Sequence, residues 1–162
     1  MSDFEELYRR HAPDVFRFAL YLSGNRSEAE DITSEAFVRA WTSSEKIRTA
    51  TVKGYLFTIA RNLFLQGLRR SSRTVAIPET LADPAEGAEA RAERDSRLAA
   101  ALRALQRLPE IDRAALLMRA ADEMAYEEIA RALGLSLASV KVRIHRARVA
   151  LRALDEAGNK EA

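Results

Sequence analysis

YEEIARALGLSLASVKVRIHRARVAL, residues 126–151, contains two short apolar repeats separated by a single glycine. The apolar residues recur every three or four positions on both sides of Gly134, a spacing typical of helices. Gly134 tolerates the left-handed backbone that ends a helix, and the Ser136 hydroxyl can accept the backbone N–H groups that begin the next one. The segment therefore predicts a helix-turn-helix.

Cations surround the second of these predicted helices. Residues 129–152 contain six Lys or Arg and no Asp or Glu. Surface helices normally carry both charges, and a helix without carboxylates is typical of insertion into the DNA major groove. A packed helical hairpin with a solvated basic face is the alternative. We favour DNA binding, through Ser136, Ser139, Lys141, Arg143, Arg146 and Arg148.

The bulk composition excludes several classes of protein. Of the 162 residues, 48% are hydrophobic and 31% charged, and no run approaches the ~20 apolar residues of a membrane span. The charged start lacks an export segment, so we expect a cytoplasmic protein without membrane insertion. The lack of cysteine excludes disulfides and thiolate chemistry, and the two histidines, His11 and His145, are far apart. We expect no metal, no cofactor and no catalytic site.

Charge and periodicity divide the chain into two helical parts. Residues 71–96 contain three basic and six acidic residues, together with Pro78 and Pro84, and their first half has no lasting apolar stripe. Such a segment predicts a flexible linker whose end can become helical. We therefore predict an all-α protein of two small helical bundles, residues 3–71 and 97–155, joined by a linker at residues 72–96.

Three helices are predicted in the first bundle. The first begins near Asp3, kinks or restarts at Pro13 and ends by Gly24. Ser27 and Glu30 have the spacing of a capping box for the second helix. Its inner face is expected to hold Ala29, Ile32, Ala36, Phe37, Ala40 and Trp41.

A polar loop at residues 42–51 precedes the third helix of this bundle. That helix carries a one-sided apolar stripe made of Tyr55, Leu56, Ile59, Ala60, Leu63 and Phe64. In the second bundle, leucines from Leu98 to Leu108 mark a helix that Pro109 stops. A further helix then leads into the helix-turn-helix, so the second bundle should have four helices.

The order of these segments resembles that of a bacterial RNA polymerase sigma factor of the extracytoplasmic-function (ECF) group. Residues 29–41, AEDITSEAFVRAW, are similar to the second-region helix that docks on the polymerase clamp. Residues 54–70 resemble the promoter-reading helix that follows, and residues 108–152 resemble the fourth region throughout. The sequence departs from the family pattern in two places. In the second region, Ser34 stands where Gln is common and Gln66 where Asp is common. In the fourth region, Ala138, Ser139 and Val140 stand where glycine, threonine and valine usually open the recognition helix.

The resemblance implies a specificity subunit that binds core RNA polymerase, reads the minus-35 and minus-10 promoter elements and assists melting. The helix-turn-helix residues named above would read the upstream element. A melted strand needs cations and planar groups, and these would be Lys46, Arg48, Lys53, Tyr55, Arg61 and Asn62. For Tyr55, core packing is an equal alternative.

The polymerase clamp would bind carboxylates of the second helix. Asp31 and Glu35 lie four residues apart on one helical face that Glu28 continues, and a solvated acidic face is the alternative interpretation. The resemblance also implies an anti-sigma protein as a partner. The alternative function is a stand-alone helix-turn-helix regulator that binds duplex DNA as a dimer.

Overall fold

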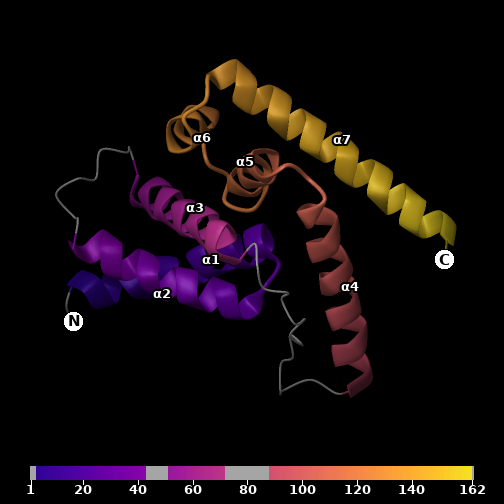
Figure 1. The fold of residues 1–162 in the computed structure, drawn as a ribbon, viewed down its shortest axis with the longest axis horizontal. Helices are drawn as coiled ribbons and strands as arrows, with labels where there is room; N and C mark the ends of the chain where they lie inside the picture. The colour runs from indigo at the N-terminus through magenta and orange to yellow at the C-terminus, as the bar shows by residue number, and fades with distance from the viewer. Residues whose placement is uncertain (1–2, 43–50, 72–87, 162) are drawn as a thin grey trace.

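The computed structural model describes residues 3–42, 51–71 and 88–161, and within these ranges it contains seven α-helices and no strand (Figure 1). The predicted all-α class is confirmed. The helices in chain order are α1 Asp3–Ser23, α2 Arg26–Thr42, α3 Val52–Ser71, α4 Ala88–Gln106, α5 Glu110–Ala120, α6 Tyr126–Leu133 and α7 Leu137–Glu161.

Helices α1, α2 and α3 pack against one another as the first bundle. Its centre is apolar, because each helix turns a stripe of large side chains inward. The rings of Phe18 and Phe57 stack with their centroids 4.5 Å apart and their planes 6° from parallel. Val15, Leu22 and Leu56 are completely buried around them. This bundle gives α2 and α3 fixed positions side by side.

Two of the helix boundaries differ from the predictions. Helix α1 runs unbroken through Pro13, so the predicted restart is wrong. A proline inside a helix costs roughly 3 kcal/mol, and burial of the apolar side chains that follow it offsets this cost. The predicted capping box of α2 is also wrong, because Ser27 lies inside the helix and Asn25 caps it by accepting the Glu28 N–H at 2.9 Å. Gly24 ends α1 as predicted, with φ at 70°.

Trp41 does not lie on the inner face of α2 as predicted. Its side chain is 49% exposed, and its ring meets the ring of Phe4 edge-on with the centroids 5.3 Å apart. The other residues predicted for the inner face of α2 are buried. Helical spacing therefore predicted the inner face of α2 correctly except at Trp41, which lies one residue before the end of α2 and whose ring is half exposed.

Helix α5 is the centre of the second bundle. All residues from Asp112 to Met118 are buried, because α7 packs on one side of α5 and α1 of the first bundle on another. The two bundles therefore touch, through α1 with α5 and through α3 with α6 (Figure 1). Of the segment predicted as a linker, residues 88–96 form the first half of α4, and residues 72–87 lie outside the described residues.

Candidate nucleic-acid and polymerase interfaces

The helix-turn-helix forms as predicted. Gly134 ends α6 with φ at 66°, and the N–H of Leu135 donates to the carbonyl of Ala130 at 2.9 Å. The Ser136 hydroxyl accepts the Ser139 N–H at 3.1 Å and so caps α7. Val140, Ile144 and Ala147 are buried on the inner side of α7, which turns its cations outward.

A buried carboxylate holds two of those cations. Asp112 of α5, whose side chain is only 1% exposed, accepts a hydrogen bond from Nη1 of Arg143 at 2.9 Å. Arg146 donates to the same carboxylate through Nε at 3.0 Å and Nη2 at 3.2 Å. Burial raises the pKa of Asp112, but hydrogen bonds from Arg146 and Arg143 outweigh burial and hold that pKa below its ordinary value. Asp112 therefore fixes the position of α7 relative to α5.

The other residues predicted to contact the upstream element differ in how many contacts with neighbouring side chains hold them in place. Lys141 and Arg148 are exposed on α7, and Ser136 is exposed just before that helix. The Ser139 hydroxyl accepts a hydrogen bond from Nε of Arg143 at 3.2 Å, so Arg143 is held at two of its nitrogens. The ammonium of Lys141 lies 5.7 Å from the centroid of the Tyr126 ring, within the range of a cation–π contact.

Four of the residues predicted to hold a melted strand lie on α3, and we call the surface that they mark the α3 face: Lys53, Tyr55, Arg61 and Asn62. At about 100° per residue these positions extend more than halfway around the helix. Lys46 and Arg48, predicted to join them, lie outside the described residues. Asn62 is exposed, and Tyr55 is partly buried and packs against the apolar core. Both interpretations of Tyr55 are therefore compatible with its position.

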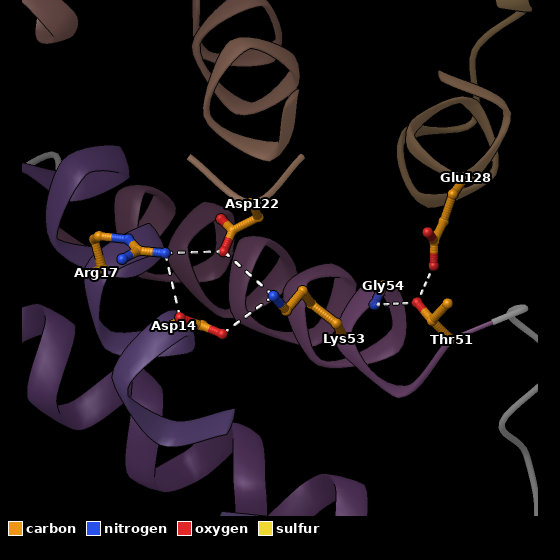
Figure 2. A network of polar contacts seen from close by, with 7 residues as sticks. All are labelled: Asp14, Arg17, Thr51, Lys53, Gly54, Asp122 and Glu128. Atoms are coloured by element: carbon orange, nitrogen blue, oxygen red, sulfur yellow. Dashed lines mark hydrogen bonds and ion pairs between the residues drawn. The ribbon is translucent and has the colours of Figure 1, made fainter. Parts of the chain in front are cut away.

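Carboxylates from both bundles contact the two cations of the α3 face. Arg61 forms a two-bond ion pair with Glu110, at 2.7 Å from Nε to Oε1 and 2.8 Å from Nη2 to Oε2. Lys53 Nζ lies 3.1 Å from Asp14 and 3.7 Å from Asp122 (Figure 2). These acidic partners were not predicted, since no periodic pattern connects positions so far apart in the sequence.

The residues predicted to bind polymerase line one groove between α2 and α3. Glu28, Asp31 and Glu35 share this α2–α3 groove with Ser34 and Gln66, the positions of the second region that depart from the family pattern. Burial raises the pKa of Glu28, and the neighbouring Asp31 raises it further. The remaining lining residues are Ile32, Val38, Arg39, Leu63, Gly67 and Arg70. The groove thus combines an acidic edge with exposed apolar surface.

The described residues contain no cluster of three or more His, Cys, Asp or Glu side chains that could hold a metal ion. Among the described helices, none combines the length and the apolar character needed to cross a membrane.

Comparisons with known proteins agree with this arrangement. The family described as Sigma-70 region 2 matches residues 7–74, and the family described as Sigma-70, region 4 matches residues 98–151. The ECF RNA polymerase sigma factor EcfG of Rhodopseudomonas palustris is 33% identical over 148 residues, covering 88% of this chain and 79% of the relative. The chain belongs to the ECF RNA polymerase sigma factors. Its first bundle is sigma region 2, and its second bundle is sigma region 4.

Other members of the family extend the comparison. SigE of Mycolicibacterium smegmatis is 42% identical over 158 residues, and the alignment covers 94% of this ECF chain but only 61% of the relative. The solved structure of RpoE from Bartonella quintana, in complex with the anti-sigma factor NepR, has a TM-score of 0.74 at 25% identity and covers 96% of this chain and 98% of that one. CnrH, in complex with the cytosolic domain of CnrY, has a TM-score of 0.71 at 28% identity, covering 95% and 88%.

Proposed function

We propose that this ECF sigma factor binds core polymerase through the α2–α3 groove, reads the upstream promoter element with α7 and holds the melted strand on the α3 face. The observation that carries the proposal is that the two matched sigma regions lie in separate bundles, each with its own candidate surface. In this proposal, residues 3–71 bind polymerase and the minus-10 element, and residues 97–155 bind the minus-35 element. Residues 72–96 link the two parts.

The α2–α3 groove suits a partner with basic and apolar side chains. Glu28, Asp31 and Glu35 supply carboxylates at its edge, while Val38, which is 53% exposed, supplies apolar contact. Charges at the rim of an interface steer association, and the apolar centre contributes most of the affinity. The polymerase clamp is the partner that we assign to this groove.

On the upstream duplex, exposed and constrained cations take different roles. Lys141 and Arg148 are exposed and can contact phosphates or bases, although Lys141 lies over the Tyr126 ring in the absence of DNA. Arg146 keeps both of its bonded nitrogens on Asp112 and contributes positive charge to the phosphate backbone. Arg143 contacts a base through Nη2 in this proposal, since its Nε and Nη1 donate to Ser139 and Asp112. Ser136 and Ser139 complete the contacts of the first turn.

On the melted strand, we assign the cations to phosphates and the planar side chains to bases. Lys53 and Arg61 bind phosphates, and Lys46 and Arg48 join them in the proposal on sequence grounds. Asn62 offers both a donor and an acceptor to a base edge. Tyr55 offers a ring on which a flipped base can stack.

We assign an anti-sigma protein as a further partner, because one solved relative, RpoE, is in complex with an anti-sigma factor. The RpoE structure includes NepR, and the CnrH structure includes the cytosolic domain of CnrY. Such a partner would cover the polymerase-binding surface, of which the α2–α3 groove is the main described part. The assigned place of action is the cytoplasm, where polymerase and chromosome lie.

Transcription with purified core polymerase tests the proposal. We expect core enzyme and this protein together to initiate at defined starts on genomic DNA of the source organism, and core enzyme alone to give none of these starts. A variant with Asp31→Lys and Glu35→Lys should lose both core binding and initiation, while Glu127→Lys, on the exposed side of α6, should retain both. Initiation by the groove variant at the normal level would refute the assignment of the groove.

The alternative function, a stand-alone regulator, predicts the opposite results for DNA binding and for initiation. Such a protein binds its operator tightly by itself and does not alter the start sites of core polymerase. Tight, sequence-specific duplex binding by the free protein, with no new starts in the presence of core enzyme, would favour that function over ours.

A further inference from the structure

Asp112 of α5 lies beneath the helix that we propose to read the upstream element. Its side chain is 1% exposed, and its carboxylate accepts hydrogen bonds from two guanidinium groups of α7, those of Arg143 and Arg146. A side chain buried this deeply cannot itself touch a base. Any effect of Asp112 on the reading of DNA must therefore act through the two arginines.

Arg143 is anchored at two of its three nitrogens. Nη1 donates to Asp112 at 2.9 Å, and Nε donates to the Ser139 hydroxyl at 3.2 Å. A guanidinium group is planar, so two anchored nitrogens also fix the direction of the third. The side chain of Arg143 is 29% exposed, and none of the described residues accepts a hydrogen bond from Nη2. Arg143 thus presents one unengaged nitrogen to DNA.

The number of unengaged nitrogens determines which bases an arginine can distinguish. A two-bond contact with O6 and N7 of guanine uses Nη2 together with either Nε or Nη1, and in Arg143 both of these already donate. A single N–H can instead be accepted by guanine, by N7 of adenine or by O4 of thymine. An arginine limited to one bond therefore discriminates little among these three bases.

We propose that Asp112 is a positioning residue that sets the base preference of α7 without contacting DNA. By holding Nη1, Asp112 confines Arg143 to a one-bond contact through Nη2, and the promoter position that Arg143 reads stays permissive. The inference rests on the proposed base contact of Arg143 and deepens it by naming what limits its selectivity.

The restraint should persist when DNA binds. Taking a partner away from a buried charge is costly, because water cannot replace the lost bond. Arg146 already donates to the same carboxylate through Nε at 3.0 Å and Nη2 at 3.2 Å, so these nitrogens offer no further bond in place of the one from Arg143. Ser139 and Arg143 lie four residues apart on α7, so the second anchor enters the DNA groove together with Arg143.

Arg146 differs from Arg143 in what its release would change. Its side chain is 58% exposed, and in the proposed function it contributes charge to the phosphate backbone. Phosphate contacts carry no base information, so releasing Arg146 affects binding to all sequences alike. Releasing Arg143 changes the preference at one position. The two effects separate when each base is compared with the other bases at its own position.

Initiation from altered promoters tests the proposal with the full chain and core polymerase. The template is a promoter identified by the transcription assay described above, with each base of its upstream element varied in turn. Arg143→Ala identifies the position that this residue reads, because the base preference should change there. Asp112→Leu keeps a branched side chain but removes the acceptor. Leu102→Ala, at a buried position of α4, is the control for loss of stability.

We expect Asp112→Leu to raise the preference for guanine at the Arg143 position at least about fivefold over wild type, the lower end of the discrimination by a two-bond contact. Preferences at the other positions should stay within about twofold, because separate positions contribute almost independently. The gain should disappear when Arg143→Ala is added. Asp112→Asn should give a smaller shift in the same direction, which keeps the test informative should Asp112→Leu fold poorly. Leu102→Ala should lower initiation from all templates by one common factor.

An unchanged preference for guanine in both Asp112 variants would overturn the proposal. A loss of initiation that is uniform over all templates, as expected for Leu102→Ala, would overturn it too, because Asp112 would then only stabilise the fold. Normal initiation with no position that depends on Arg143 would refute the base contact of Arg143, and this inference with it. Failure of the wild-type protein to direct initiation would instead refute the proposed sigma function on which the inference rests.

Discussion

Replacing Asp112 by asparagine tests how the recognition helix is held. In the native protein this carboxylate makes three hydrogen bonds, one with Arg143 and two with Arg146. The amide has the same shape but no charge, and its NH₂ group would face two guanidinium groups that can only donate. The variant therefore leaves Arg143, whose side chain is 29% exposed, without its ionic partner.

The expected loss of unfolding free energy is about 2 kcal/mol. A hydrogen bond to a charged group contributes about 1.5–3 kcal/mol, and the bond to Arg143 lies in the partly buried part of the site. Arg146 is solvent-exposed, so its bonds orient the guanidinium and add little to stability. Removing a buried carboxylate also relieves the cost of its own burial, which keeps the net loss below the gross sum of the bonds.

Urea denaturation followed by far-UV circular dichroism measures this loss, with Glu127→Gln as the control at an exposed position. Because the folded pKa of Asp112 is lowered, its contribution is complete above the ordinary carboxyl pKa of 3.8 and is lost as the pH falls through the folded pKa. The difference between wild type and variant should therefore be constant near neutral pH. A loss below about 0.5 kcal/mol would refute the inference that Asp112 anchors α7.

Three further predictions concern single positions. Gly134→Ala should cost about 1 kcal/mol in urea denaturation, because φ is 66° while nothing lies within 4 Å of the added Cβ; a neutral effect would mean that the turn relaxes. Asn25→Ala should cost about 1 kcal/mol by removing the cap of α2, whereas Ser27→Ala should cost little. Burial, with Arg10 and Lys53, lowers the pKa of His11, so stability should decrease as the pH falls below 6.5 through that lowered pKa. His11→Gln should flatten this dependence in denaturation curves, and an identical slope in the variant would exclude His11 as its source.

Helical periodicity and capping residues were sufficient to predict most helices and the turn of the DNA-binding motif. The left-handed Gly134 and the cap at Ser136 follow from interactions within a few residues, so a sequence pattern can report them. The α2–α3 groove was partly predictable, because Asp31 and Glu35 are spaced for one helical face. The cap of α2 was assigned to Ser27 instead of Asn25, since both residue types are good caps and only backbone geometry distinguishes them.

The sequence by itself determined two helical bundles, a basic recognition helix and membership of a sigma-factor family. These features depend on helical periodicity, on local capping and on the order of motifs, all of which can be read directly from the amino-acid sequence. Only the tertiary structure decided that Asp112 restrains Arg143 and Arg146, and that Glu110 pairs with Arg61. The partners in these pairs are 31, 34 and 49 residues apart, and a charge finds such a partner only after packing has brought the helices together.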